Sequence, residues 1–227
     1  MKLCVALDMA TKKQNLNLAK KLKEYDIWLK IGFRSYIRDT NIILQELKNI
    51  NENFKIFLDL KLHDIPNTMA DAACEIASLG VDMFNVHASS GKVAMQTVMQ
   101  RLKQIKNPPL VLAVTALTSF DQKGFYEIYH EDIQTKAIKF AKDSYESGLD
   151  GVVCSAYESK AIKENTDKNF ITLSPGIRPF GEDKDDQKRV ATIDLAKKEL
   201  VDFIVVGRAI YNSNEPQKVV QKIIESL

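Results

Sequence analysis

The sequence lacks the features that mark membrane, secreted and zinc-binding proteins. No run approaches the ~20 consecutive apolar residues of a membrane-spanning helix, and the amino terminus has no signal-peptide apolar core with a cleavage site. Its three cysteines, Cys4, Cys74 and Cys154, are isolated and follow no CxxC spacing, so neither a disulfide framework nor a zinc site is indicated. We therefore expect a soluble cytoplasmic protein with reduced cysteines.

An excess of charge of one sign and flexible linkers are also missing. The 32 basic residues nearly balance the 30 acidic ones, and a formal charge of +2 predicts no basic face for nucleic acid. No segment rich in Pro, Gly or Ser divides the chain. With 227 residues, 45% of them hydrophobic, the chain is long enough for one large core. These properties predict a single domain over residues 1–227 that binds neither nucleic acid nor membrane.

Short apolar runs alternate with stretches of helical periodicity along the whole chain. Helices are expected, for example, at residues 11–24 and 71–79. Buried strands joined by crossover helices pair in parallel, and eight such units predict a closed (β/α)8 TIM barrel. A doubly wound open sheet is the weaker alternative, because no GxGxxG turn is present. The eight apolar runs lie at residues 3–7, 27–31, 56–58, 83–86, 110–114, 151–153, 170–173 and 203–206.

Charged side chains stand at the carboxyl ends of the first three predicted strands, where TIM barrels carry their active sites. Side chains alternate between the two faces of a strand, so Asp59 and Lys61 project together at the end of the third strand. Asp8 and Lys30 occupy the equivalent ends of the first and second strands. Singly, Asp8 could be a helix N-cap and Lys30 a surface lysine. Together, the four charges favour a catalytic site.

Other polar residues lie at the ends of the fourth and fifth predicted strands. Asn85 and His87 belong to the fourth, and His87 is either a core histidine or part of the site lining. The fifth run ends near Thr118. His63 and His130 have no ligand spacing that would identify a metal site, so they are treated as structural.

The last two predicted strands end in segments suited to binding a phosphate. Gly207 and Arg208 follow the eighth strand, where glycine lets backbone N–H groups approach an anion and a helix amino terminus adds its dipole. Arg208 would hold the dianion through its guanidinium group. Residues 178–189, after the seventh strand, are too hydrophilic to pack. They are either a disordered surface loop or a lid over the ligand, and their place beside the phosphate favours the lid.

Two longer motifs contain most of these residues. One is DLKLHDIPNT at residues 59–68, and the other is SPGIRPFGEDKDDQ at residues 174–187, which is followed by VGRAI at residues 206–210. With these motifs the chain resembles the orotidine 5′-phosphate decarboxylase family, and the resemblance runs from Asp8 to Arg208.

The resemblance implies that orotidine 5′-phosphate is converted to uridine 5′-phosphate and carbon dioxide, in de novo pyrimidine biosynthesis, without metal or cofactor. It implies that Lys61 donates the proton and that Asp59, Asp64 and Lys30 assist. It also implies a homodimer with shared sites, in which Asp64, Ile65 and Thr68 reach into the partner's site, and a contact of Gln187 with the phosphate. The residues implied to contact the nucleotide are Asp8, Lys30, Asp59, Asp64, Ile65, Thr68, Thr118, Arg178, Gln187, Gly207 and Arg208.

Two other functions remain open at this point. A metal-dependent sugar-phosphate decarboxylase or aldolase on a related barrel would share the DxKxxD pattern, but usually has an acid where Lys30 stands. A non-catalytic barrel that binds a phosphate ligand would not need Lys61 between two acids. Lys30 and the DIPNT segment argue against the first, and Lys61 with both acids argues against the second.

Overall fold

A closed parallel barrel forms the centre of the molecule. The computed structural model describes residues 1–181 and 188–227. Within them, eight strands follow one another around the barrel in sequence order, and β8 pairs with β1 to close it. The predicted (β/α)8 TIM barrel is therefore confirmed, and the open sheet is excluded. The strands are β1 (Lys2–Ala6), β2 (Trp28–Gly32), β3 (Lys55–Leu62), β4 (Met83–His87), β5 (Leu110–Val114), β6 (Gly151–Val153), β7 (Ile171–Ser174) and β8 (Phe203–Val206).

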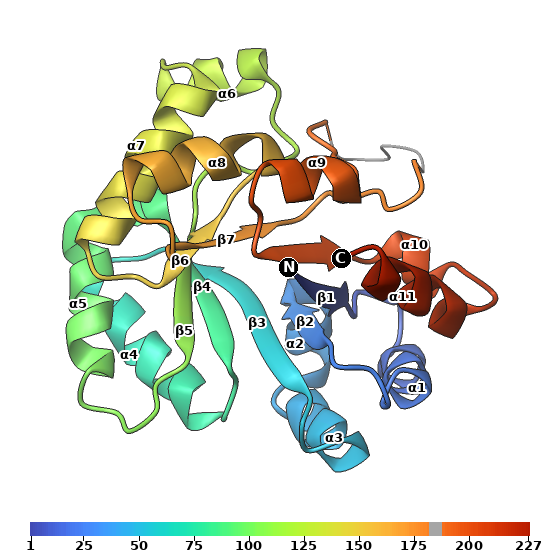
Figure 1. The fold of residues 1–227 in the computed structure, drawn as a ribbon. Coiled ribbons are helices and arrows are strands. Elements are labelled where there is room, and N and C mark those ends of the chain that lie inside the picture. Colours follow the sequence, from blue (N-terminus) through green and yellow to red (C-terminus); the bar gives the residue numbers. More distant parts are fainter. Residues whose placement is uncertain (182–187) are drawn as a thin grey trace.

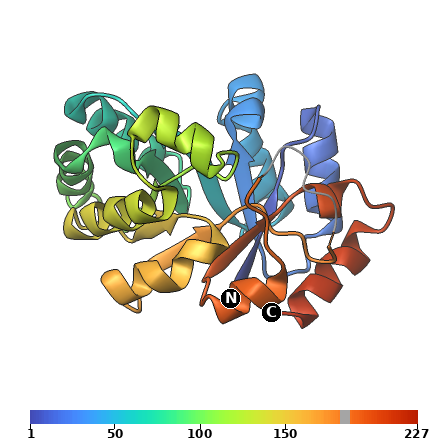
Figure 2. The ribbon, with the colours of Figure 1, turned by 90° about the horizontal axis from the view of Figure 1, so that it is seen from above.

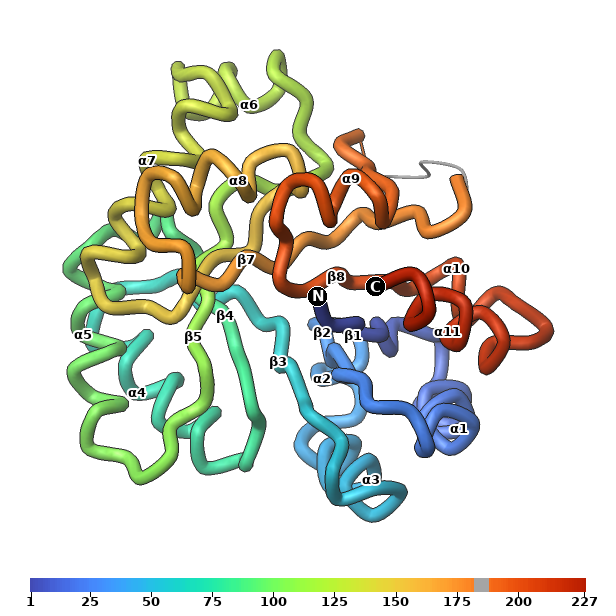
Figure 3. Tube along the Cα trace, in the orientation of Figure 1, coloured from blue at the N-terminus to red at the C-terminus, as the bar shows by residue number. Residues whose placement is uncertain are grey.

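Helices connect the strands and form an outer ring around them (Figure 1). The two chain termini lie side by side (Figures 1 and 2), and α6 lies beyond α7, outside the ring (Figure 3). Among the described residues, no helix is both long and apolar enough to cross a lipid bilayer. The helices are α1 (Lys12–Lys21), α2 (Phe33–Asp39), α3 (Ile42–Ile50), α4 (Pro66–Ser78), η1 (Ala88–Ser90), α5 (Lys92–Leu102), α6 (Gln122–Tyr129), α7 (Ile133–Glu146), α8 (Ala156–Asn165), α9 (Ile193–Lys198), α10 (Arg208–Tyr211) and α11 (Pro216–Glu225).

The predicted helices are present with shifted ends. The helix expected at 11–24 is α1, which begins one residue later because Thr11 is its N-cap and accepts a hydrogen bond from the Gln14 N–H at 3.2 Å, and which ends at Lys21 with Leu22 as its C-cap. The helix expected at 71–79 is α4, and its start at Pro66 was missed. Proline is favoured in the first turn of a helix, where its missing N–H needs no partner.

Alternation along the strands divides the apolar side chains into two sets. In β1, Leu3 and Val5 pack against the helices, whereas Cys4 and Ala6 belong to the cluster that fills the barrel interior. The interior cluster therefore ends below the polar residues at the carboxyl ends of the strands. Its buried members are Cys4, Ala6, Phe57, Met83, Leu112, Val114, Val153, Leu173, Phe203 and Val205.

Strand β3 has an irregularity next to the site. It advances from Leu58 to Leu62 while its partner β4 advances only from Phe84 to Val86, so β3 bulges between these pairs. Lys61 lies in the bulge with a φ of 47°. This left-handed conformation costs a non-glycine residue on the order of 1–3 kcal/mol, and such strain is concentrated at functional sites.

Candidate active site

A cavity of about 470 Å³ opens at the carboxyl ends of the strands. Its volume is in the range of pockets that bind small ligands, roughly 300–1,000 Å³. The apolar part of the lining includes Ala6, Phe57, Val114 and Val205, which belong to the interior cluster. The barrel interior therefore supplies a packed floor that excludes water from below.

Four charged side chains form a row of alternating sign along the cavity. Lys30 Nζ lies 3.1 Å from Asp8 Oδ2 and 3.3 Å from Asp59 Oδ2. Lys61 Nζ lies 2.6 Å from the other oxygen of Asp59. Asn85 joins the row from β4, because its Nδ2 donates to Asp59 Oδ1 at 2.8 Å and its Oδ1 accepts the Lys61 N–H at 2.7 Å. The structure thus brings together all four charges that the strand ends suggested.

Burial and ion pairing together set the charges in this row. Burial by itself would raise the pKa of the Asp59 carboxyl, but Lys30 and Lys61 with the Asn85 hydrogen bond lower that pKa to about 2. Burial would likewise lower the pKa of Lys30, but Asp59 and Asp8 raise it above its ordinary value. Asp59 and Lys30 are each only 9% exposed, so water screens their field weakly. Both are therefore charged at neutral pH.

A second group of residues that line the cavity, from the ends of β5, β7 and β8, suits an anion. Thr118 follows β5, Arg178 follows β7, and Gly207 and Arg208 follow β8 directly, and all four line the cavity. A Cβ atom on Gly207 would lie 3.3 Å from both Ala6 Cβ and the Tyr211 ring, which also line the cavity, so glycine allows this turn to pack closely against them. Two guanidinium groups match the geometry of a phosphate dianion. Helix α10 has only four residues, so the helix dipole expected at this turn would be weak, and the side chains and backbone N–H groups are the candidate anion ligands.

The whole chain is similar to known proteins in sequence and in fold. Residues 1–223 match the model of the orotidine 5'-phosphate decarboxylase / HUMPS family. The chain belongs to this family. It is 65% identical to the orotidine 5'-phosphate decarboxylase of a Nitratiruptor species and 61% identical to that of Campylobacter jejuni serotype O:23/36, over the full length of each chain. The crystal structure of orotidine 5'-phosphate decarboxylase from Lactobacillus acidophilus has a TM-score of 0.85 and 31% identity, covering 99% of this chain and 98% of that chain.

Some residues implied by the decarboxylase family do not line the cavity. Asp64, Ile65 and Thr68 are exposed on the turn after β3 and the start of α4. The Asp64 carboxylate accepts a hydrogen bond from the N–H of Ile65 at 2.7 Å. Gln187 and the rest of the segment 182–187, within the expected lid, lie outside the described residues.

The decarboxylase family resemblance gave no role to Asn85 and left His87 open. The sequence had placed Asn85 on the fourth strand, without a role, and the structure shows that it contacts both Asp59 and Lys61. His87 Nδ1 lies 2.8 Å from Ser89 Oγ. Burial, with His63 and Lys61 nearby, lowers the pKa of His87 to about 4, so it is neutral at pH 7. Within residues 1–181 and 188–227, no group of three or more His, Cys, Asp or Glu side chains is arranged to hold a metal ion.

Proposed function

We propose that this protein converts orotidine 5′-phosphate to uridine 5′-phosphate and carbon dioxide, the UMP-forming step of de novo pyrimidine biosynthesis, without metal or cofactor. The observation that carries the proposal is the Asp59 carboxylate held between the ammonium groups of Lys30 and Lys61, in a cavity that two arginines also line. Full-length identity of 65% to a relative named for this reaction supports it.

The reaction requires positive charge and a proton at one carbon atom. When the bond from C6 to the carboxylate breaks, the electron pair stays on C6, where resonance stabilises it little, and carbon dioxide leaves. The Lys61 ammonium, fixed 2.6 Å from Asp59, stabilises this charge and then donates its proton to C6. Lys61 is left neutral and takes up a proton from solvent before the next turnover.

Asp59 and Lys30 support Lys61 in this step. The Asp59 carboxylate orients the Lys61 ammonium and opposes the substrate carboxylate, and that repulsion disappears as neutral carbon dioxide forms. Lys30 binds the second oxygen of Asp59 and links it to Asp8. We assign Lys30, Asp59, Lys61 and the partner's copy of Asp64 to catalysis, and Asp8 to contact with the nucleotide.

The cavity-lining residues at the ends of β5, β7 and β8 bind the remote part of the substrate in this proposal. Thr118, Arg178, Gly207 and Arg208 contact the nucleotide there, with Gln187 as a further phosphate ligand. Binding energy gained far from C6 orients the ring against the Lys61 ammonium and lowers the barrier at the reacting carbon.

We further propose a cytoplasmic homodimer in which Asp64, Ile65 and Thr68 contribute to the partner's site. Ile65 is 67% exposed, and Phe33, whose ring centre lies 5.5 Å from Lys61 Nζ, is 50% exposed. Large apolar side chains exposed beside a charged site suit an interface that covers them. The three free cysteines suit a reducing compartment.

One assay separates this function from the two alternatives. Purified protein is given orotidine 5′-phosphate in the presence of a chelator, and the loss of substrate absorbance is followed. We expect turnover in the chelator. Activity that requires an added divalent cation would favour the metal-dependent barrel enzyme, and nucleotide binding without turnover would favour a binding protein.

A further inference from the structure

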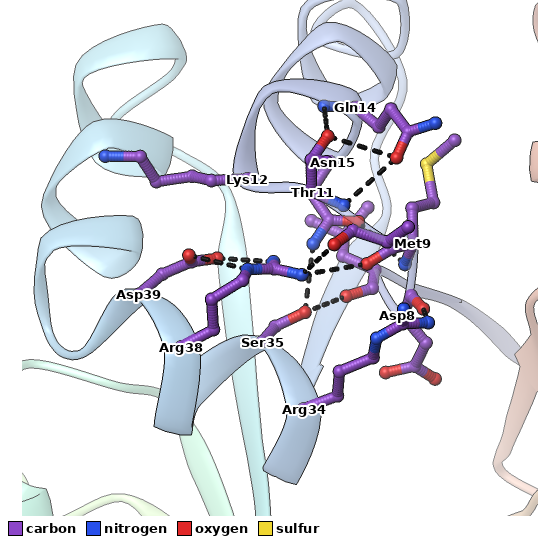
Figure 4. Close-up of polar contacts among 12 residues, drawn as sticks. Asp8, Met9, Thr11, Lys12, Gln14, Asn15, Arg34, Ser35, Arg38 and Asp39 are labelled. Carbon is purple, nitrogen blue, oxygen red and sulfur yellow. Dashed lines mark hydrogen bonds and ion pairs between the residues drawn. The ribbon is translucent and has the colours of Figure 1, made fainter.

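The two residues that flank Asp8 are both held by buried side chains. The carbonyl oxygen of Leu7 accepts a hydrogen bond from Ser35 Oγ at 2.7 Å. The N–H of Met9 donates to Asn15 Oδ1 at 3.1 Å, and Asn15 Nδ2 donates to Ser35 Oγ at 2.9 Å. Asn15 and Ser35 therefore form a hydrogen-bonded pair, here called the relay, that holds the backbone on each side of Asp8 (Figure 4).

Burial makes this relay more than an incidental contact. Asn15 lies on α1 and Ser35 on α2, and both are 0% exposed. Two buried polar side chains cost desolvation free energy that apolar residues of similar size would avoid. Their hydrogen bonds join three separate segments of the chain, so the relay fixes the geometry of the β1–α1 loop.

A second contact from α2 holds the same loop further on. Arg38 Nη1 donates to the carbonyl oxygens of Met9 at 3.1 Å and Ala10 at 2.7 Å. Its guanidinium group is itself fixed by Asp39 through two contacts of 2.7 and 2.5 Å. Figure 4 shows Arg38 reaching from α2 between Asp39 and the loop.

We propose that Asn15 and Ser35 are positioning residues for Asp8, which keep its carboxylate against Lys30 while the substrate is bound. Helix α2 follows β2 directly, so the segment that carries Lys30 also holds the loop of Asp8. The packing is tight here, since a Cβ atom on Gly32 would lie 3.0 Å from Lys30 Nζ and 3.2 Å from Asp8 Oδ1. The inference rests on the proposed function, in which Asp8 contacts the nucleotide.

A double-mutant cycle on the turnover of orotidine 5′-phosphate tests the proposal. Ser35→Ala removes the centre of the relay and should lower kcat/KM roughly tenfold to a hundredfold, as expected when a substrate contact shifts by about 1 Å. In the Asp8→Ala background the same change should lower kcat/KM by less than about twofold, because Ser35 acts only through Asp8. A crystal structure of Ser35→Ala should show the Asp8 carboxylate displaced from Lys30.

A matched control separates positioning from the loss of any buried serine. Ser144 is also 0% exposed, and its Oγ donates to the Phe140 carbonyl at 2.7 Å, but it lies on α7 and does not line the cavity. Ser144→Ala should leave kcat/KM within about twofold of the unmodified protein. If Ser35→Ala does not fold, Ser35→Cys replaces it, since the thiol keeps the shape but is a weak donor. Its loss should again depend on Asp8.

Equal fold losses from the Ser35 change in both backgrounds would overturn the inference, as would a variant structure with Asp8 still against Lys30. Absence of turnover in the unmodified protein would contradict the proposed function instead. The position of Asp8 in the crystal structure of the Ser35 variant would then decide the inference by itself.

Discussion

Replacing Lys61 by alanine tests the central step of the proposed reaction. The change removes the ammonium group 2.6 Å from Asp59 but leaves Lys30 at 3.3 Å from its other oxygen and the Asn85 hydrogen bond at 2.8 Å. Asp59 therefore keeps a cation and a donor, and we expect Lys61→Ala to fold. The substitution relieves the strain of the left-handed backbone at residue 61 only slightly, because alanine has a Cβ atom like lysine.

The expected loss of kcat follows from the two roles of Lys61. A positioned proton donor contributes about 10²–10⁴-fold, and one preorganised electrostatic contact to the developing charge about 10²–10³-fold. Because both are lost together, kcat should fall by about 10⁴–10⁷-fold. Binding of the product uridine 5′-phosphate should change by less than about tenfold, since Lys61 acts on charge that forms only in the transition state.

The assay compares kcat for orotidine 5′-phosphate with calorimetric binding of uridine 5′-phosphate. Lys55→Ala is the matched control: Lys55 lies at the other end of β3 and pairs with Asp82 at 2.8 Å, outside the cavity. It should leave kcat unchanged. A Lys61→Ala protein that retains more than about a tenth of kcat would refute the assignment of Lys61 as proton donor.

Three further predictions concern the phosphate, the shared site and the fold. Arg208→Ala should lower kcat/KM for orotidine 5′-phosphate about 10- to 100-fold, the loss of one charged contact, yet hardly affect the nucleoside orotidine, and equal losses on both substrates would contradict the assignment. Lys61→Ala and Asp64→Ala proteins, each inactive alone, should recover about a quarter of full activity after subunit exchange, because half the dimers then hold one intact site; a mixture that exchanges but stays inactive would show that Asp64 acts within its own chain. Arg189→Ala should lower the free energy of unfolding in urea by about 3–5 kcal/mol, because it leaves the Glu158 side chain, 2% exposed, as an unpaired buried acid. Adding Glu158→Gln should recover part of that loss, and a single-variant loss below about 1 kcal/mol would show that the pair is not needed.

The alternation of apolar runs and helical stretches along the sequence was sufficient to predict the barrel. Eight apolar runs separated by helical stretches leave few other arrangements, and alternation in β1 already separates Leu3 and Val5 from Cys4 and Ala6. The placement of Asp8 follows from the same rule, because the inward parity continues to the strand end. These features depend on local spacing, which a single sequence contains.

The geometry at Lys61 required the tertiary structure. Alternation predicts that Asp59 and Lys61 share a face, and they do meet, but through a bulge against β4 and a φ of 47° at Lys61. The Asn85 amide on the next strand stabilises this bulge, because its Oδ1 accepts a hydrogen bond from the Lys61 N–H. The position of a bulge depends on the register between two strands, which neither strand's own sequence contains.

The hydrogen bonds that Asn15 and Ser35 make behind Asp8 also could not be predicted from the sequence. Asn15 and Ser35 are 20 positions apart and neither lies in a motif, although Asn15 is in phase with the buried residues Leu18 and Ala19 of α1. Pairing of β1 with β2 brings residues of α1 and α2 to the loop after β1, and only then do these buried polar groups find partners. The sequence alone therefore determined which charges stand at the strand ends. The tertiary structure decided what holds them, because buried hydrogen bonds between distant segments form only once the chain has packed.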